Sequence, residues 1–278
     1  MQKLLFLLAF GCAFFVSAPA QTLRTPPIST PQFIRQDFGL STIELSYSRP
    51  GVKGRTIFGD LVPYGKVWRT GANQATTLTF GDSVTIGGAT IPPGKYGLLS
   101  IPGADAWTFI ITRQTDVTSP AAYREDQDLV RIKAEPHQLP FTVETMTMDF
   151  SDLTGSSCRL DLLWDRVAVG FDIRTNTDAR VMSQIGAIMN HDTHPYYQAA
   201  VYYVENGKDL NKALEWLDKA IAEDPSAYFA VYQKARCLAK LGRKQEAVAA
   251  AQSSIELSRK ANNPDYVALN EKLIASLQ

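Results

Sequence analysis

Residues 143–150 read Val-Glu-Thr-Met-Thr-Met-Asp-Phe, and polar and apolar residues alternate clearly from Thr145 to Phe150. A period of two places every second side chain on the same face of a β-strand, so the pattern predicts a strand with one buried and one wet face. The same alternation occurs at residues 42–47 and 76–80. We therefore expect antiparallel strands that each contribute one face to a common core.

The remainder of residues 33–175 has the same organisation. Short apolar runs are separated by turn-forming pairs such as Gly87-Gly88 and Pro102-Gly103. Further candidate strands are residues 84–86, 95–101, 107–112, 130–134, 158–164 and 167–173. Roughly nine or ten short strands without intervening amphipathic helices predict an antiparallel β-sandwich or barrel.

Residues 178–278 have a different composition, with Ala, Leu, Lys and Glu at helical spacing. Small and apolar residues also recur there with a period of about 34 residues, which is typical of tetratricopeptide repeats. The repeated positions are Ala213, Leu217 and Ala220, followed by Ala247, Ala251 and Ser254. The sequence thus predicts a β + α two-domain chain in which an all-α module of tetratricopeptide-like helical hairpins follows the β domain.

The first twenty residues have the composition of a secretory signal peptide. Lys3 is followed by the apolar run 4–16 and by the small-residue triplet Ala18-Pro19-Ala20. The apolar run is too short to cross a bilayer of about 30 Å as a helix, and no later run is long enough. We expect cleavage near Ala20, a flexible N-terminus over residues 21–32, no transmembrane segment, and a periplasmic or secreted protein.

Charge and metal-ligand content exclude several classes of partner. The chain has 28 Lys and Arg against 28 Asp and Glu, so it has no overall field to attract nucleic acid. It has three histidines and neither a CxxC nor an HExxH motif, and we expect no metal site and no cofactor. Cys158 and Cys237 fall in different domains, and each is predicted to be a small buried hydrophobic residue.

Residues 45–81, which we call the basic segment, have an asymmetric charge. They contain five cations and a single acid, Asp60, among several glycines. Backbone N–H groups of glycine-rich loops and arginine side chains bind anions, and aromatic faces bind sugars or apolar groups. The candidate ligand-binding residues are Arg49, Lys53, Arg55, Tyr64, Trp68, Arg69 and Asn73, for a small anionic or glycan ligand. In the alternative interpretation, the arginines hold long loops through backbone carbonyls and Trp68 caps the core.

Several stretches of the β domain together resemble the DUF2911 family. These stretches are Tyr47–Arg55, Ile57–Gly59, Leu61–Asn73, Pro93–Leu98, Ile101–Gly103 and Trp107. The resemblance runs nearly unbroken from Tyr47 to Thr112 and more loosely to Ile173. It implies an exported protein of Bacteroidetes-like bacteria, in some members with a similar helical tail, and it implies no assigned activity.

Three functional hypotheses follow. The first is a non-enzymatic binding protein whose β domain holds a ligand and whose helical repeats bind a protein or peptide, with Tyr197 and Tyr202 as candidate partner-binding residues. The second is a hydrolase of envelope polymers or glycans whose acids converge only in the fold. Its candidate acids are Glu44, Asp60, Glu144 and Asp149. The third is a structural component of envelope assembly. Because no Gly-x-Ser-x-Gly motif occurs, the sequence favours a protein that is not an enzyme.

Overall fold

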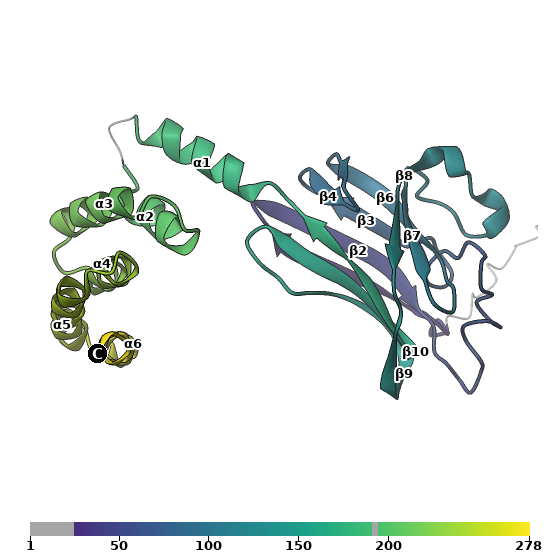
Figure 1. Ribbon diagram of the computed structural model, residues 1–278. Helices are drawn as coiled ribbons and strands as arrows, with labels where there is room; N and C mark the ends of the chain where they lie inside the picture. The colour runs from purple at the N-terminus through teal and green to yellow at the C-terminus, as the bar shows by residue number, and fades with distance from the viewer. Residues whose placement is uncertain (1–24, 191–193) are drawn as a thin grey trace, which may run out of the picture. The chain divides into compact units, whose positions relative to one another are not determined.

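The computed structural model describes residues 25–190 and 194–278, so the predicted signal peptide lies outside the described residues. The chain divides into two compact units, and the boundary lies between Thr175 and Asn176. The first unit is built of antiparallel sheets and the second of helices, which confirms the predicted fold class (Figure 1).

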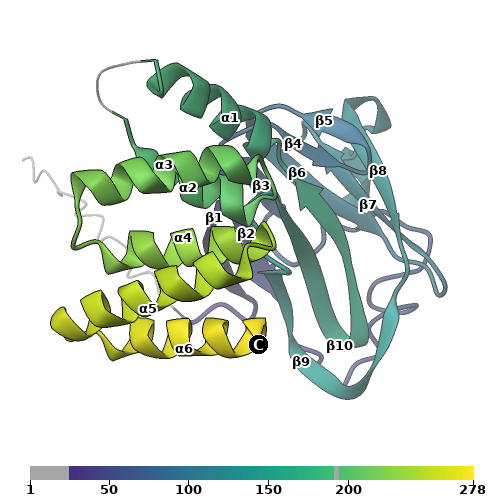
Figure 2. The ribbon, with the colours of Figure 1, turned by 60° about the vertical axis from the view of Figure 1, so that its left-hand side comes forward.

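The β unit consists of two antiparallel sheets. Its strands are β1 (Thr30–Phe38), β2 (Ser41–Arg49), β3 (Thr77–Phe80), β4 (Val84–Ile86), β5 (Ala89–Ile91), β6 (Gly94–Ile101), β7 (Trp107–Thr112), β8 (Asp128–Ala134), β9 (His137–Ser151) and β10 (Ser157–Arg174). One sheet has the order β1-β2-β3-β6-β7-β8 and the other β5-β4-β10-β9. Figure 2 shows the long strands β9 and β10 running side by side.

The alternation at residues 143–150 has the predicted structural consequence. In β9, Met146, Met148 and Phe150 are buried, whereas Thr145 and Asp149 are exposed. The buried residues join a core to which both sheets contribute, including Leu45 of β2 and Leu78 of β3. This core is the frame on which the loops of the β unit are held.

Two details of the β unit differ from the expectation. β1 begins at Thr30, which pairs with Arg49. Residues 30–32 of the segment that was expected to be flexible therefore belong to a strand. The two strands expected at 158–164 and 167–173 are one strand, β10. Its pairing with β9 shifts register on both sides of Asp165, which has a φ of 54° and forms a bulge that lets the strand continue.

The part of the basic segment between β2 and β3, residues 50–76, has no long strand of its own. Isolated antiparallel bridges join Gly51 to Thr145 of β9 and Trp68 to Ser100 of β6. At the second bridge, the Trp68 N–H donates to the Ser100 carbonyl over 2.7 Å, and the Ser100 N–H donates back over 2.9 Å. The segment is therefore fastened to one strand of each sheet.

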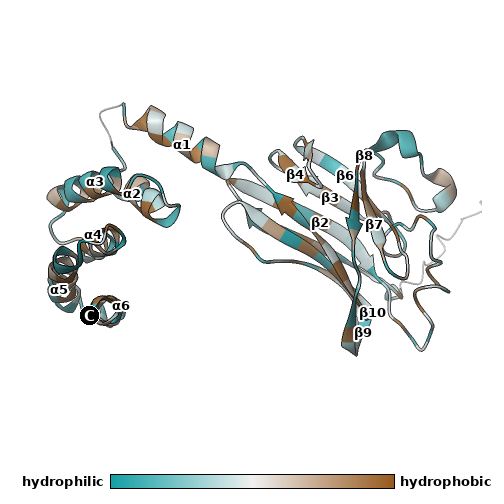
Figure 3. Cartoon of the chain, in the orientation of Figure 1, coloured by the Kyte–Doolittle hydropathy of each residue, from teal (hydrophilic) through white to brown (hydrophobic). Residues whose placement is uncertain are grey.

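The helical unit contains two helical hairpins with flanking helices. Its helices are α1 (Thr177–Ile188), α2 (Tyr196–Glu205), α3 (Leu210–Glu223), α4 (Tyr228–Lys240), α5 (Lys244–Lys260) and α6 (Pro264–Leu277). The small residues Ala200, Ala213, Ala235 and Ala247 are fully buried, so neighbouring helices approach closely. Figure 3 shows brown and teal side by side on α4 to α6, as expected for helices with one apolar face.

The turns between paired helices also follow the sequence pattern. Gly207 and Gly242 adopt φ values of 63° and 75°, in the left-handed region where glycine ends a helix without strain. The carboxylate of Asp209 then accepts hydrogen bonds from the N–H groups of Asn211 and Lys212 and caps α3. Among the helices in the described parts of the chain, none is both long and apolar enough to span a bilayer.

Candidate ligand-binding site

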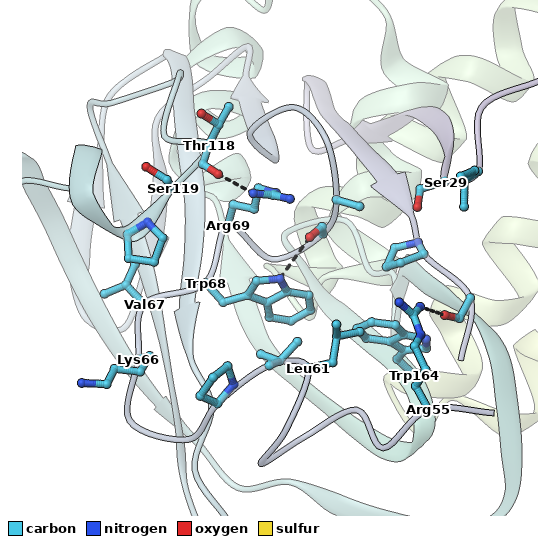
Figure 4. A pocket seen from close by; sticks show the side chains of 18 of the residues that line it. Ser29, Arg55, Leu61, Lys66, Val67, Trp68, Arg69, Thr118, Ser119 and Trp164 are labelled. Carbon is cyan, nitrogen blue, oxygen red and sulfur yellow. Dashed lines mark hydrogen bonds between the residues drawn. The ribbon is translucent and has the colours of Figure 1, made fainter. Parts of the chain in front are cut away.

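A pocket of about 520 Å³ lies in the β unit in front of Trp68 (Figure 4). Most of its walls come from the basic segment. The rest comes from Ile28 and Ser29 before β1, from Thr118–Pro120 in the loop between β7 and β8, and from Trp164 of β10. The pocket therefore combines residues that lie far apart in the sequence.

One wall of the pocket is aromatic. The rings of Trp68 and Trp164 stack with centroids 5.9 Å apart and planes inclined by 20°, and Phe58 meets both rings edge-on. Trp164 is only 1% exposed, and the Trp68 indole N–H donates to the Gly71 carbonyl over 3.0 Å. These contacts hold the indole of Trp68 in one orientation, so the wall exists before any ligand arrives.

Four cations line the same pocket: Lys53, Arg55, Lys66 and Arg69. The guanidinium of Arg55 donates to the carbonyls of Val52 and Gly51 over 3.1 and 2.6 Å. No Asp, Glu or His is found among the described residues that line the pocket. The positive charge of the rim is therefore not neutralised by an acid within the lining.

Arg69 holds a different part of the wall. Its Nη1 donates to the carbonyl of Thr118, and Figure 4 shows this bond beside the indole of Trp68. Its Nε is buried and has no hydrogen-bond partner within residues 25–190 and 194–278. A buried donor without an acceptor is costly in free energy, so Arg69 occupies this position at a cost to stability.

A strained turn directs Arg69 toward the pocket. The next residue, Thr70, has a φ of 55° although it is β-branched, and Gly71 follows with a φ of 156°. The Thr70 hydroxyl lies 2.9 Å from that of Ser100, and its carbonyl accepts from the Thr76 hydroxyl over 2.8 Å. A side chain on Gly71 would lie 3.1 Å from the Ser48 carbonyl oxygen, so glycine suits this close approach.

The loop that carries Thr118–Pro120 is held at its far end by a second polar cluster. The Tyr123 hydroxyl donates to the Asp128 carboxylate over 2.5 Å, and Arg131 Nε donates to the same oxygen over 2.9 Å. Burial and the bond to Asp128 raise the pKa of Tyr123 to about 12, so the hydroxyl keeps its proton at neutral pH. The loop is thus anchored by Arg69 on one side and by this cluster on the other.

Four of the seven predicted ligand-binding residues meet at the pocket, namely Lys53, Arg55, Trp68 and Arg69. The other three, Arg49, Tyr64 and Asn73, are not part of its lining. Arg49 donates to the Met146 carbonyl over 2.9 Å and to the Thr147 hydroxyl over 2.6 Å. Arg49 therefore matches the alternative interpretation, in which an arginine holds the fold.

The other two outlying residues also make contacts within the unit. The Asn73 amide donates to the Ser29 carbonyl over 3.1 Å. Tyr64 lies against Gly59, where a side chain would come within 2.9 Å of the tyrosine ring. Gly59 has a φ of 92°, so a residue without a side chain suits both its backbone and its neighbour.

The candidates predicted from the sequence did not include Lys66, Leu61, Trp164 or Thr118–Pro120, which also line the pocket. Leu61 lies inside the basic segment, between Arg55 and Lys66 in the sequence. This position could have identified it as a candidate pocket residue. Alternation in residues 158–164 marks Trp164 as inward-facing, but nothing local connects it with Trp68. Thr118–Pro120 carry no such signal, because a loop position depends on the whole fold.

The four acids considered for hydrolysis are not brought together at this pocket. They are Glu44, Asp60, Glu144 and Asp149, and none is among the residues that line it. Glu144 accepts the backbone N–H of Lys53 over 2.9 Å, and Asp149 accepts that of Phe150 over 2.8 Å. Within the described chain, no group of three or more His, Cys, Asp or Glu is placed to hold a metal ion.

The two cysteines of the described chain are buried and are not joined to each other. Burial raises the pKa of the Cys158 thiol to about 12 and also raises the pKa of Cys237. Because the thiolate is the reactive form, we expect neither cysteine of the folded protein, residues 21–278, to react with iodoacetamide at pH 8. Mass spectrometry should detect two adducts after unfolding in guanidinium chloride, and rapid labelling of the folded protein would contradict this prediction.

The two tyrosines proposed for partner binding lie in α2 of the helical unit. The Tyr202 hydroxyl donates to Asp178 of α1 over 2.9 Å, and Lys208 pairs with the same carboxylate at 2.8 Å. Tyr197 packs edge-on against Phe229 of α4, with ring centroids 5.0 Å apart. Burial raises the pKa of Tyr202 to about 12 and also raises that of Tyr197, so both hydroxyls stay neutral.

Comparison with known proteins gives two matches of different kinds. A family model described as a protein of unknown function (DUF2911) matches residues 29–173, about half of the chain. A model described as anaphase-promoting complex, cyclosome, subunit 3, matches residues 180–254, where the tetratricopeptide-like repeats lie. No curated protein and no solved structure matches the chain.

Proposed function

The chain belongs to the DUF2911 family, and from the geometry of its pocket we propose that it is an exported, non-enzymatic binding protein. In this proposal the protein is periplasmic or secreted, and its β unit holds a small anionic or glycan ligand in front of Trp68. Its helical unit binds a protein or peptide. The observation that carries the proposal is one pocket that joins an aromatic wall to four cations.

The pocket has the size and chemistry of a small-molecule site. Its volume of about 520 Å³ lies within the range of about 300–1,000 Å³ that is usual for such sites. The hydrolase hypothesis needs two acids, or an acid and a histidine, beside Arg69, and the described lining gives it no support. The assembly hypothesis predicts a filled region around Trp68, and an open pocket there favours binding instead.

The helical unit supports the second half of the proposal. Its match to a model with tetratricopeptide-like repeats indicates a protein-interaction module. Stacked helical hairpins expose one face of the first helix of each pair, and such faces bind extended peptides or helices. In this unit those helices are α2 and α4, which carry the partly exposed rings of Tyr197, Phe229 and Tyr232.

A thermal-shift screen of residues 21–278 tests the ligand half of the proposal. The panel contains sugars, glycan fragments, peptides and phosphorylated metabolites. A ligand present at about 100 times its Kd stabilises the folded state by about 2.7 kcal/mol, which raises Tm. We expect at least one such ligand, and we expect its effect to be lost in Arg69→Met.

Arg35→Met is the matched control, because Arg35 is an exposed cation on β1 of the same unit and is absent from the pocket lining. The control should keep the full thermal shift. A panel without any stabilising member would contradict the ligand half of the proposal. An equal loss of the shift in both variants would show that general charge, and not the pocket, is responsible.

A further inference from the structure

We propose that the ligand of this pocket is an amphipathic organic anion, with a flat apolar body against Trp68 and a carboxylate or similar oxyanion at Arg69. The inference rests on the proposed function, since it assumes that the pocket binds a small molecule. It goes further because it chooses between the two ligand classes, anions and neutral glycans, that the basic segment allows.

The walls favour an apolar body. The side chains Leu61, Val62, Pro63, Val67, Trp68 and Trp164 all line the pocket. Leu61 is 44% exposed, so it offers apolar surface that a bound ligand can cover. The indole of Trp68 is fixed by its stacking on Trp164 and by its bond to Gly71. A flat body that covers these groups removes apolar surface from water without reorganising the wall.

The polar groups of the lining are mainly donors. Ammonium and guanidinium groups donate hydrogen bonds and accept none. A neutral sugar presents hydroxyls that also need acceptors, which protein sites supply through carboxylates and carboxamides. The described lining contains the hydroxyls of Ser29, Thr118 and Ser119, but no Asp, Glu, Asn, Gln or His side chain. A ligand group that only accepts hydrogen bonds, such as a carboxylate, fits this set of donors better than a sugar does.

Arg69 is the best-prepared anchor for that group. Its bond to the Thr118 carbonyl fixes the guanidinium, and the strained turn at Thr70 fixes its backbone. Because the Nε–H is buried, a carboxylate would be received by the terminal N–H groups of the guanidinium, which lines the pocket. In Figure 4, Arg69 lies on one side of the Trp68 indole, while Lys66 and Arg55 lie on others. These further cations add long-range attraction for an anion.

Isothermal titration calorimetry with four probes tests the proposal on residues 21–278. 2-Naphthoate combines a flat ring with a carboxylate, and 2-naphthamide has the same ring without charge. Acetate is the anion without the ring, and maltose is a neutral sugar. We expect 2-naphthoate to bind at least tenfold more tightly than 2-naphthamide, and we expect no detectable binding of acetate or maltose at the same concentrations.

Two variants locate the binding. Arg69→Met should bring the Kd values of 2-naphthoate and 2-naphthamide within about threefold of each other, because the ring contacts remain and the charge contact is lost. Arg35→Met should leave the tenfold preference unchanged. Because Arg69 also holds the Thr118 loop, Leu61→Trp is an independent test. Leu61 is half-exposed, so a larger side chain should fill the pocket without entering the core and should abolish binding of 2-naphthoate.

The outcomes separate this inference from the proposed function. Equal affinity for 2-naphthoate and 2-naphthamide, or tight binding of maltose that Leu61→Trp abolishes, would overturn the ligand class and leave the binding function standing. A failure of 2-naphthoate to bind at millimolar concentration would also overturn the inference. The function itself fails only if the broad thermal-shift panel contains no ligand either.

Discussion

Replacing Trp164 by alanine is expected to lower the free energy of unfolding of the β unit by about 3–5 kcal/mol. Trp164 is 1% exposed, and the ring centroids of Phe58 and Trp68 each lie 5.9 Å from the centroid of its ring. Alanine would remove these contacts and leave a cavity, because the rigid rings of Phe58 and Trp68 cannot move far enough to fill the space. The aromatic near-ultraviolet circular dichroism of the β unit, followed during urea unfolding, measures the loss.

Trp164→Phe is the matched control for this prediction. The indole N–H of Trp164 is buried and has no hydrogen-bond partner in the part of the chain that the structure describes. Phenylalanine therefore keeps most of the ring and sacrifices no hydrogen bond, so its cost should be less than half that of alanine. An alanine variant that loses less than about 1 kcal/mol would show that the ring is not packed as described.

Gly97→Ala is expected to damage both stability and ligand binding. Gly97 lies in β6, where an added Cβ would come within 2.0 Å of the Gln114 carbonyl oxygen and 3.0 Å of the Thr112 side chain. The first contact is with the backbone, so the loop between β7 and β8 must move. Overpacking of this kind costs about 1–3 kcal/mol. Because Thr118–Pro120 of that loop line the pocket, ligand affinity should fall as well.

The control for Gly97 is a glycine with space around it. A Cβ on Gly155 would meet no atom within 4 Å, so Gly155→Ala should change the free energy of unfolding by no more than about 0.5 kcal/mol. Urea unfolding and titration of the thermal-shift ligand are measured on both variants. If Gly97→Ala has the same unfolding midpoint and the same ligand affinity as the unchanged protein, the result would contradict the close approach of Gly97 to the Gln114 carbonyl.

The regular elements could be predicted wherever the sequence pattern is local. Alternation identified the inward residues of β9, and the period of about 34 residues identified the helical hairpins. β1 was missed because the more buried face of this edge strand carries Gln32 and Gln36 beside Ile34 and Phe38, so its sequence lacks a clear apolar–polar alternation. Its place is set by pairing with β2 along its whole length, and pairing is not a local property.

Some residues of the candidate site could be predicted from the sequence, and others are brought to it only by the fold. Lys53, Arg55 and Arg69 lie in one glycine-rich segment, so their common location could be expected from the sequence. Arg49 lies in the same stretch, but it ends β2 and its guanidinium reaches β9 instead of the pocket. Trp164 lies in β10, far from the basic segment in the sequence, and only the assembled sheets bring it to the pocket.

Two of the isolated bridges of the basic segment, those that join it to the sheets, allow the pocket to change without a change in the core. The bridge at Gly51 and the bridge at Trp68 fix the segment to β9 and β6, and residues 53–66 between them belong to no long strand. Insertions or deletions in this interval would resize the pocket without changing the register of either sheet. The length of this interval is therefore a place where the size of the pocket can be changed by design while both sheets are kept.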